Sequence, residues 1–418
     1  MKPYFTLTGF SSVTPDEWGL DPEPRAGMEA IEAALGVSYG CLRERLTKAL
    51  SHFVLGLYDT KLGALHHYYR PDIQYLSEFD SGNFLMALNF VVLSDTTGDS
   101  SALVKAESCY RYAMNHFCDR HPMAFWQGGV RDGLKPNELW VKYTGDAAWL
   151  ATSLYRRTRN TNYLRDLHQF HNFFKRAREA DFAYTFDTST YAWKHQGNVW
   201  RAFGFPITAY LELYESTREQ RFRDEALRWG QHALELQAPT GAFYLLDGHF
   251  WNSDLTAPEL RGLINLWELS DETKFLDAAT AYTDWLLLQQ RNDGAWPLCI
   301  DLDEEVCVET VGPGDPPNIA LSLVRLHAAT GLDTYLHAAT KAVRYGLSMQ
   351  VCEEGAYPLY LDDPKAKWGF WSWDPLQDHS LSGDQSIHHV RGSLFLASYI
   401  SALAEAGKLP TTVLTEGE

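Results

Sequence analysis

The chain has 418 residues, of which 45% are hydrophobic and 14% aromatic, so it can bury a large core and is not a disordered chain. Its formal net charge of −18 argues against nucleic acid as a partner, because phosphate binding needs a basic face. No stretch approaches the roughly 18 apolar residues of a membrane span, and no signal peptide is visible. We therefore expect a cytoplasmic protein that does not bind membranes.

The cysteines and the short motifs exclude several kinds of site. The six cysteines form no CxxC pair, and they are Cys41, Cys109, Cys118, Cys299, Cys307 and Cys352. We interpret them as reduced, buried thiols, with a disulfide left open. The chain has no HExxH motif or paired Cys/His spacing, no glycine-rich phosphate loop after a strand and no GxSxG elbow. We expect no metal and no cofactor.

In chain order, residues 1–28 are rich in Pro, Gly, Ser and Thr and predict an irregular arm. A long amphipathic helix is predicted over 29–58. Further helices are predicted at 82–95, 99–117, 145–157, 162–178, 198–214, 219–236, 256–269, 272–289, 317–329, 333–350 and 386–405. The residues 407–418 form a tail.

One helical connector recurs five times. Each copy ends an apolar stretch, turns at a Thr or Ser and starts a second helix. The turn residues are Thr97, Thr158, Thr217, Ser270 and Thr330. Five positions after them stand Ala102, Tyr163, Phe222, Phe275 and Tyr335. A repeat of 53 to 61 residues predicts stacked helical hairpins.

The paired helices differ in composition. One member, as in NVWRAFGFPITAYLEL, is apolar all round, while its partner, as in RFRDEALRWGQHALEL, carries a charged stripe. Six buried and six half-exposed helices in alternation predict an all-α fold, an (α/α)6 barrel over 29–406. The long loops would all emerge on one face, where the N-termini of the inner helices favour an anionic ligand.

Charged residues gather in those loops. The candidate carboxylates are Asp80, Asp132, Asp146, Asp254 and Asp384, and N-capping is the alternative for each. Candidate anion-binding arginines are Arg201, Arg261 and Arg391, and ion pairing with carboxylates is their alternative.

Aromatic and histidine side chains are also frequent in the loops. Candidate sugar-stacking residues are Trp126, Trp200, Trp251 and Trp371, with loop packing as the alternative. His195 and His388 are candidate proton carriers or hydrogen-bonding groups.

Three stretches resemble the unsaturated glucuronyl hydrolases, a family of six-hairpin glycosidases: EFDSGNFLMALNFVVLSDTTGD, HQGNVWRAFGFPITAYLELYEST and NSDLTAPELRGLINLWEL. The resemblance places Asp80 on a catalytic aspartate and makes Asp146 the nearest match to the proton donor. It places Arg201 one turn from a substrate-contacting arginine, and Asp254 on a loop-to-helix aspartate. Phe79 stands where the family has His, so a relative acting on saturated glucuronides also fits.

These features predict an exo-acting glycoside hydrolase that removes a terminal uronic acid from an oligosaccharide. Asp146 or Asp132 would be the acid and Asp80 its partner. A uronate polysaccharide lyase, a sugar 2-epimerase of the same barrel and a non-catalytic carbohydrate-binding barrel are the alternatives. The sequence leaves open the oligomeric state, the stereochemistry and the choice between saturated and unsaturated uronate.

Overall fold

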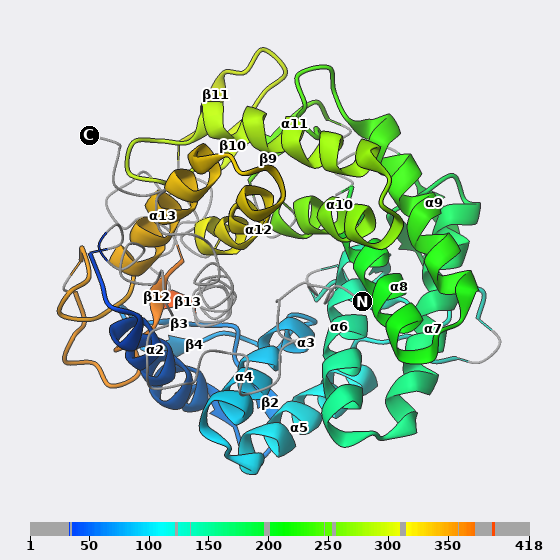
Figure 1. Cartoon of the computed structure of the whole chain (residues 1–418). Helices are drawn as coiled ribbons and strands as arrows, with labels where there is room; N and C mark the ends of the chain where they lie inside the picture. Colours follow the sequence, from blue (N-terminus) through cyan, green and yellow to red (C-terminus); the bar gives the residue numbers. More distant parts are fainter. Residues whose placement is uncertain are drawn as a thin grey trace.

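The computed structural model describes residues 33, 36–121, 124–133, 135–195, 201–245, 247–252, 256–309, 315–357, 359–372 and 387–388. Its helices form two concentric rings, as predicted (Figure 1). The inner helices are α3 (Asn83–Met86) with α4 (Leu88–Thr97), α6 (Val141–Thr158), α8 (Gly204–Thr217), α10 (Thr256–Ser270) and α12 (Asp315–Thr330). The outer helices are α2 (Tyr39–Lys48) with η1 (Ala49–Val54), α5 (Ser100–His116), α7 (Thr161–Glu179), α9 (Gln220–Leu236), α11 (Thr273–Gln289) and α13 (Asp333–Ser348).

Burial separates the two rings as the composition predicted. In α8 every residue from Gly204 to Leu213 is buried. In α9 the buried positions follow helical spacing, at Phe222, Ala226, Trp229, Gly230 and Ala233. Inner helices are therefore enclosed on all sides, while outer helices present a polar face to water.

Some predicted helix bounds were wrong. The helix predicted over 29–58 is interrupted, because Gly36 has a φ of 69° and Ser38 then caps α2 by accepting a hydrogen bond from Cys41 N at 3.1 Å. The helix predicted over 82–95 is divided at Ala87 into α3 and α4. The helix predicted over 386–405 lies almost wholly outside the described residues.

The long loops carry short antiparallel strands that the sequence analysis missed, because runs of two or three residues show no periodicity. Two four-stranded sheets have the orders β12-β13-β3-β4 and β5-β6-β7-β8. A third sheet has the order β11-β10-β9, and β1 pairs with β2. The strands are β1 (Tyr58–Asp59), β2 (Ala64–Leu65), β3 (Tyr68–Arg70), β4 (Tyr75–Leu76), β5 (Val130–Arg131), β6 (Glu138–Trp140), β7 (Thr185–Asp187), β8 (Ala192–Lys194), β9 (Phe250–Trp251), β10 (Cys299–Ile300), β11 (Val306–Val308), β12 (Phe370–Trp371) and β13 (Ile387–His388).

The described helices include none that is long and apolar enough to cross a membrane.

Candidate functional site

Asp80 lies between β4 and the first turn of inner helix α3. Its Oδ1 accepts a hydrogen bond from Gly82 N at 2.8 Å, and its Oδ2 lies 2.7 Å from His67 Nδ1. Burial acts to raise the pKa of Asp80, but His67, the Gly82 amide and the more distant Lys142 charge outweigh it, so the pKa is lowered. The side chain is 27% exposed. Asp80 is thus an accessible carboxylate rather than a proton donor.

The turn after β5 brings Asp132 to the same place. A Cβ added to Gly133 would lie only 2.6 Å from Asp80 Cβ, so the backbone next to Asp132 packs directly against Asp80. Asp132 is 9% exposed, and its N–H donates to Glu138 O at 3.0 Å across the turn. The turn that carries Asp132 and the loop that carries Asp80, 52 residues apart in the chain, are therefore neighbours.

Asp146 joins this group from inner helix α6. Lys142 and Asp146 are one helical turn apart, and Lys142 Nζ lies 3.3 Å from Asp146 Oδ2. Both side chains are nearly inaccessible, at 9% and 1% exposure. Since the Lys142 charge also lowers the pKa of Asp80, this lysine links the two aspartates electrostatically.

A second buried charged group lies at the start of α10. Burial raises the pKa of Glu259 well above its usual range, against the opposing effects of Arg201 and of the Tyr282 hydroxyl. Glu259 is 5% exposed. Arg201 itself donates from Nη1 to Tyr244 O at 2.8 Å. Glu259 is not among the site residues predicted from the sequence. An acidic residue in the first turn of an apolar helix could have indicated it as a candidate.

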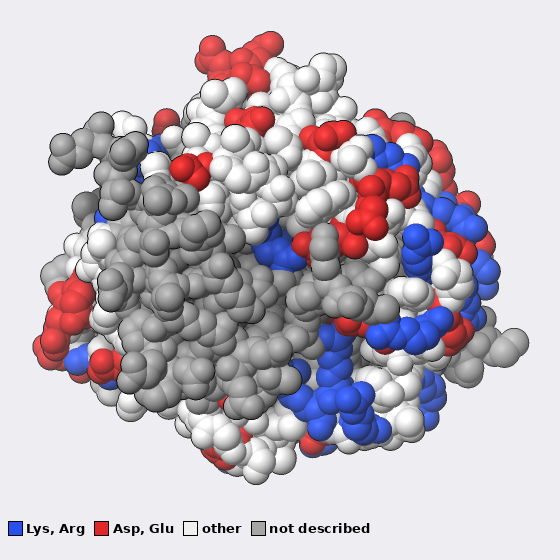
Figure 2. Space-filling view, in the orientation of Figure 1, with Lys and Arg blue, Asp and Glu red and all other residues white. Residues whose placement is uncertain are grey.

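Arg261, the next predicted anion-binding residue, is buried one half-turn further along α10. Its Nη2 donates to Asn318 Oδ1 at 2.7 Å and its Nε to Ala257 O at 3.3 Å, while Nη1 has no hydrogen-bond partner among the residues that the structure describes. Burial lowers the pKa of this guanidinium to about 9. On the face seen in Figure 2, Lys and Arg atoms are visible in the central hollow, where they favour an anion.

The predicted tryptophans have different surroundings. Trp126 is half-buried, stacks on Phe186 and donates from Nε1 to Asp119 Oδ2 at 2.9 Å. Trp371 is 1% exposed, so it belongs to the core and does not present a stacking face. Trp251 is half-buried on β9, where it pairs with Cys299.

The predicted histidines lie at the ends of short strands. His195 is exposed, directly after β8. His388 lies on β13, whose backbone pairs with Tyr68 of β3, the residue after His67. The predicted residues Asp254, Trp200, Asp384 and Arg391 lie outside the described residues.

Other arginines in these loops form ion pairs with carboxylates, which is the alternative role for the predicted anion-binding arginines. Arg70 contacts Asp72 at 2.8 Å and Arg131 contacts Asp119 at 2.9 Å. Arg201 and Arg261 differ, since within the described residues they donate hydrogen bonds to backbone carbonyls and to an amide oxygen. They are therefore the better candidates for an anionic ligand.

Comparison with known proteins supports the fold. No family model and no curated relative matches the chain. Among solved structures, it is similar to a cellobiose 2-epimerase from Bacillus thermoamylovorans, with 12% identity and a TM-score of 0.68 over 86% of this chain and 98% of that one. It is similar to an unsaturated glucuronyl hydrolase specific for heparin, with 11% identity and a TM-score of 0.62 over 92% and 100%.

A third similar structure is an α-1,6-mannanase of Salegentibacter, with 14% identity and a TM-score of 0.56 over 88% of this chain and 99% of that one. The predicted (α/α)6 barrel is therefore confirmed. At these identities the likeness establishes the architecture, which sugar epimerases and glycosidases share.

Proposed function

We propose that this chain is a sugar-active enzyme, an exo-acting glycoside hydrolase that removes a terminal uronic acid from an oligosaccharide. The observation that carries the proposal is the ionised Asp80 with the Asp132–Gly133 turn packed against it. Hydrolysis of a glycosidic bond uses two carboxyl groups, one as base and one as acid, and we assign these roles to Asp80 and Asp132. The uronyl hydrolase among the similar structures supports the choice of substrate.

In the proposed mechanism Asp80 is the base. Its lowered pKa keeps it ionised near neutral pH, and His67 holds its Oδ2 at 2.7 Å. Asp80 would accept a proton from the attacking water, while Asp132 would give a proton to the leaving oxygen. Asp132 is favoured over Asp146 as the acid, because Asp146 is ion-paired with Lys142 and is only 1% exposed.

The uronate carboxylate would be bound by arginine. Arg261 keeps an unpartnered Nη1, and Arg201 lies close enough to Glu259 to influence its pKa. Both come from the starts of neighbouring inner helices, whose N-termini add positive potential. The protonated Glu259 would leave the Arg201 charge available to the ligand.

A sugar 2-epimerase is the second candidate, and the His67–Asp80 pair favours it. A histidine whose Nδ1 is held by a carboxylate has its other ring nitrogen fixed as a proton acceptor. Such a base could remove the proton next to a sugar carbonyl. Among the similar structures, the cellobiose 2-epimerase has a higher TM-score, 0.68, than the unsaturated glucuronyl hydrolase, 0.62.

Three substrates distinguish these functions: p-nitrophenyl β-glucuronide, an unsaturated uronyl disaccharide and cellobiose in deuterated water. Release of nitrophenol or loss of the ultraviolet absorbance of the conjugated uronate is the expected result. A lyase would be identified separately, by gain of that absorbance from a saturated oligosaccharide whose uronic acid carries a sugar on O4, because elimination needs that leaving group. Deuterium at C2 of cellobiose, seen by NMR, would identify an epimerase and overturn the hydrolase. Lack of turnover in all three assays would leave a carbohydrate-binding barrel.

Asp80→Asn tests the site within whichever reaction is found. We expect its kcat to fall by about 10²- to 10⁴-fold, as for loss of a general base. The matched control is Asp99→Asn, because Asp99 is an exposed N-cap of α5 and Asn caps equally well. A near-normal kcat for Asp80→Asn would refute the assignment of Asp80.

A further inference from the structure

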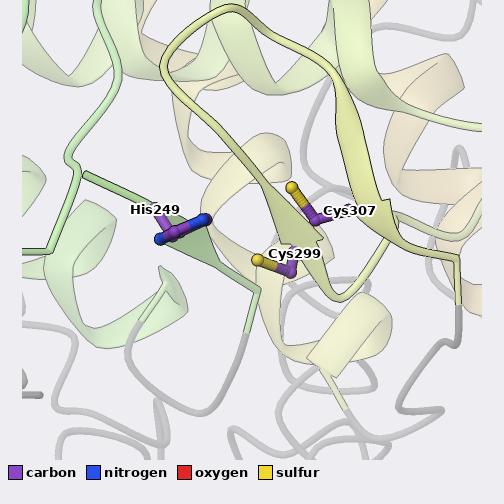
Figure 3. Close-up of side chains that lie close together, drawn as sticks. All are labelled: His249, Cys299 and Cys307. Carbon is purple, nitrogen blue, oxygen red and sulfur yellow. The ribbon is translucent and has the colours of Figure 1, made fainter. Parts of the chain in front are cut away.

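Three metal-binding side chains meet on the sheet β11-β10-β9. His249 directly precedes β9, Cys299 begins β10 and Cys307 lies on β11. One ligand atom from each lies within 4.8 Å of the others, and these are the described residues in which such a group of three is found. Figure 3 shows both sulfurs and one imidazole nitrogen turned toward a common space.

A β-bulge places the two thiols on the same side. In the ladder, Cys299 pairs with Val308 but Ile300 pairs with Val306, so the register shifts and Cys307 is the extra residue. An extra residue breaks the alternation of side chains, so Cys307 joins Cys299 instead of pointing to the opposite face. Without the bulge the two sulfurs would not meet.

The histidine and a carboxylate are already oriented. His249 Nδ1 lies 3.4 Å from Asp247 Oδ1, while the other ring nitrogen faces the sulfurs. Asp301 Oδ1 accepts hydrogen bonds from the N–H groups of Asp303 and Glu305, both at 2.9 Å. Its Oδ2 is left facing Cys307 Sγ at 3.8 Å.

We propose that His249, Cys299 and Cys307 bind a zinc ion, with Asp301 as the fourth ligand. Two sulfurs, one imidazole nitrogen and one carboxylate oxygen form a typical tetrahedral zinc set. Tetrahedral ligand atoms lie about 3.3–3.8 Å apart at zinc distances, so His249, Cys299 and Cys307 have to contract by about 1 Å, and Asp301, which lies outside their 4.8 Å group, has to move further. Asp247 behind His249 supplies the carboxylate that commonly orients a metal-binding histidine.

Binding would proceed without any redox change. Each thiol loses its proton to solvent as it becomes a zinc thiolate, and His249 binds in its neutral form. Cys307 and His249 are exposed or partly exposed, which gives the ion an entry path, while Cys299 is buried. The ion would fix β9, which precedes α10, to β10 and β11, which precede α12. The proposal rests on no step of the proposed function.

The test uses the full-length, fully reduced chain and Co²⁺ as a spectroscopic probe. We expect one equivalent to bind with a sulfur-to-cobalt charge-transfer band and tetrahedral d–d bands, and Zn²⁺ to displace it. Cys307→Ser and His249→Gln should each weaken Zn²⁺ binding by at least about tenfold. Both positions are accessible, so these variants are expected to fold.

The matched control is Cys41→Ser, since Cys41 is a partly buried thiol on α2, outside this sheet. It should bind cobalt as the unaltered chain does. Lack of a charge-transfer band in the reduced chain, or a band that survives Cys307→Ser, would overturn the zinc site. A Cys299–Cys307 disulfide found by mass spectrometry, with no cobalt uptake after reduction, would also overturn it.

Discussion

At the scale of single residues, the ionisation state of Asp80 is decided by its neighbours. Burial acts to raise the pKa of this carboxyl, but His67, the Gly82 amide and Lys142 outweigh that effect and lower it. Glu259 shows the opposite balance, since burial there outweighs Arg201. A carboxyl group is therefore prepared for proton acceptance at one helix start and for proton retention at another.

Gly133→Ala is expected to abolish most activity without unfolding the chain. The added methyl group would lie 2.6 Å from Asp80 Cβ, so Asp80 or the turn carrying Asp132 must move. A displacement near 1 Å in a catalytic pair costs about 10²-fold in rate. The measurement is kcat for the substrate that is turned over, with circular dichroism and thermal unfolding as checks on the fold.

Gly56→Ala is the control, because an added Cβ there meets nothing within 4 Å. Its kcat should equal that of the unaltered chain. Full activity in Gly133→Ala would show that the turn does not position Asp80.

At the scale of secondary-structure elements, the five connectors share one geometry. In each, the Thr or Ser hydroxyl donates to the carbonyl four residues earlier at 2.6–2.8 Å and accepts from the N–H two residues later at 3.2–3.3 Å. The residue between adopts a positive φ, and these residues are Gly98, Arg159, Arg218, Asp271 and Gly331. One hydroxyl thus ends the inner helix and starts the outer one.

Two glycines with positive φ should respond differently to alanine. Gly331 lies in a connector with nothing within 4 Å of an added Cβ, so Gly331→Ala is expected to cost only the left-handed strain, about 1 kcal/mol. In Gly294→Ala the Cβ would lie 2.1 Å from Lys341 O on α13, so backbone must separate and the loss should be several-fold larger, roughly 3 kcal/mol or more.

Denaturant unfolding of both variants measures these free energies. Equal losses at the two positions would mean that close backbone approach at Gly294 contributes little.

At the scale of the whole molecule, ion pairs connect neighbouring inner helices near the connectors. Arg157 of α6 contacts Asp95 of α4, and Arg156 contacts Glu212 of α8 at 2.9 Å. Arg325 of α12 contacts Glu268 of α10 in the same way. These pairs lie near the C-terminal ends of the inner helices, whereas Asp80 lies before the N-terminus of α3. They therefore stabilise the end of the barrel opposite to the candidate site.

Two histidines of the outer helices, the buried His171 of α7 and the partly buried His232 of α9, should make the protein sensitive to acid. Burial, with a contribution from nearby arginines, lowers the pKa of His171 and of His232 to about 4. The unfolded chain would bind these protons near pH 6.5, so stability is full above that pH and is lost as the pH falls toward 4. The loss is on the order of 3 kcal/mol for each histidine.

His171→Phe should flatten this dependence, because the aromatic ring is kept against Tyr210 and Phe222 while the titrating group is removed. The free energy of unfolding is measured by denaturant at several values between pH 7 and pH 4.5. His52→Gln, at an exposed position, should leave the slope unchanged. An unchanged slope in His171→Phe would exclude this histidine as the cause.

Much of the architecture could be predicted because it is encoded locally. The Thr and Ser connectors, the apolar inner helices and the striped outer helices are patterns within a few turns of chain. The short strands could not be predicted, since their pairing joins segments far apart, such as β3 with β13. The break after Gly36 also had only a weak local signal.

Local patterns in the chain encode the repeat, the two kinds of helix and candidate site residues such as Asp80, Asp132 and Arg201. Folding then decides which side chains become neighbours: Asp80 with His67 and the Gly133 turn, Glu259 within the electrostatic influence of Arg201, and His249 with Cys299 and Cys307. The reason is physical. Helix formation depends on neighbours in the chain, whereas ionisation and metal binding depend on neighbours in space, which ring closure and a β-bulge bring together.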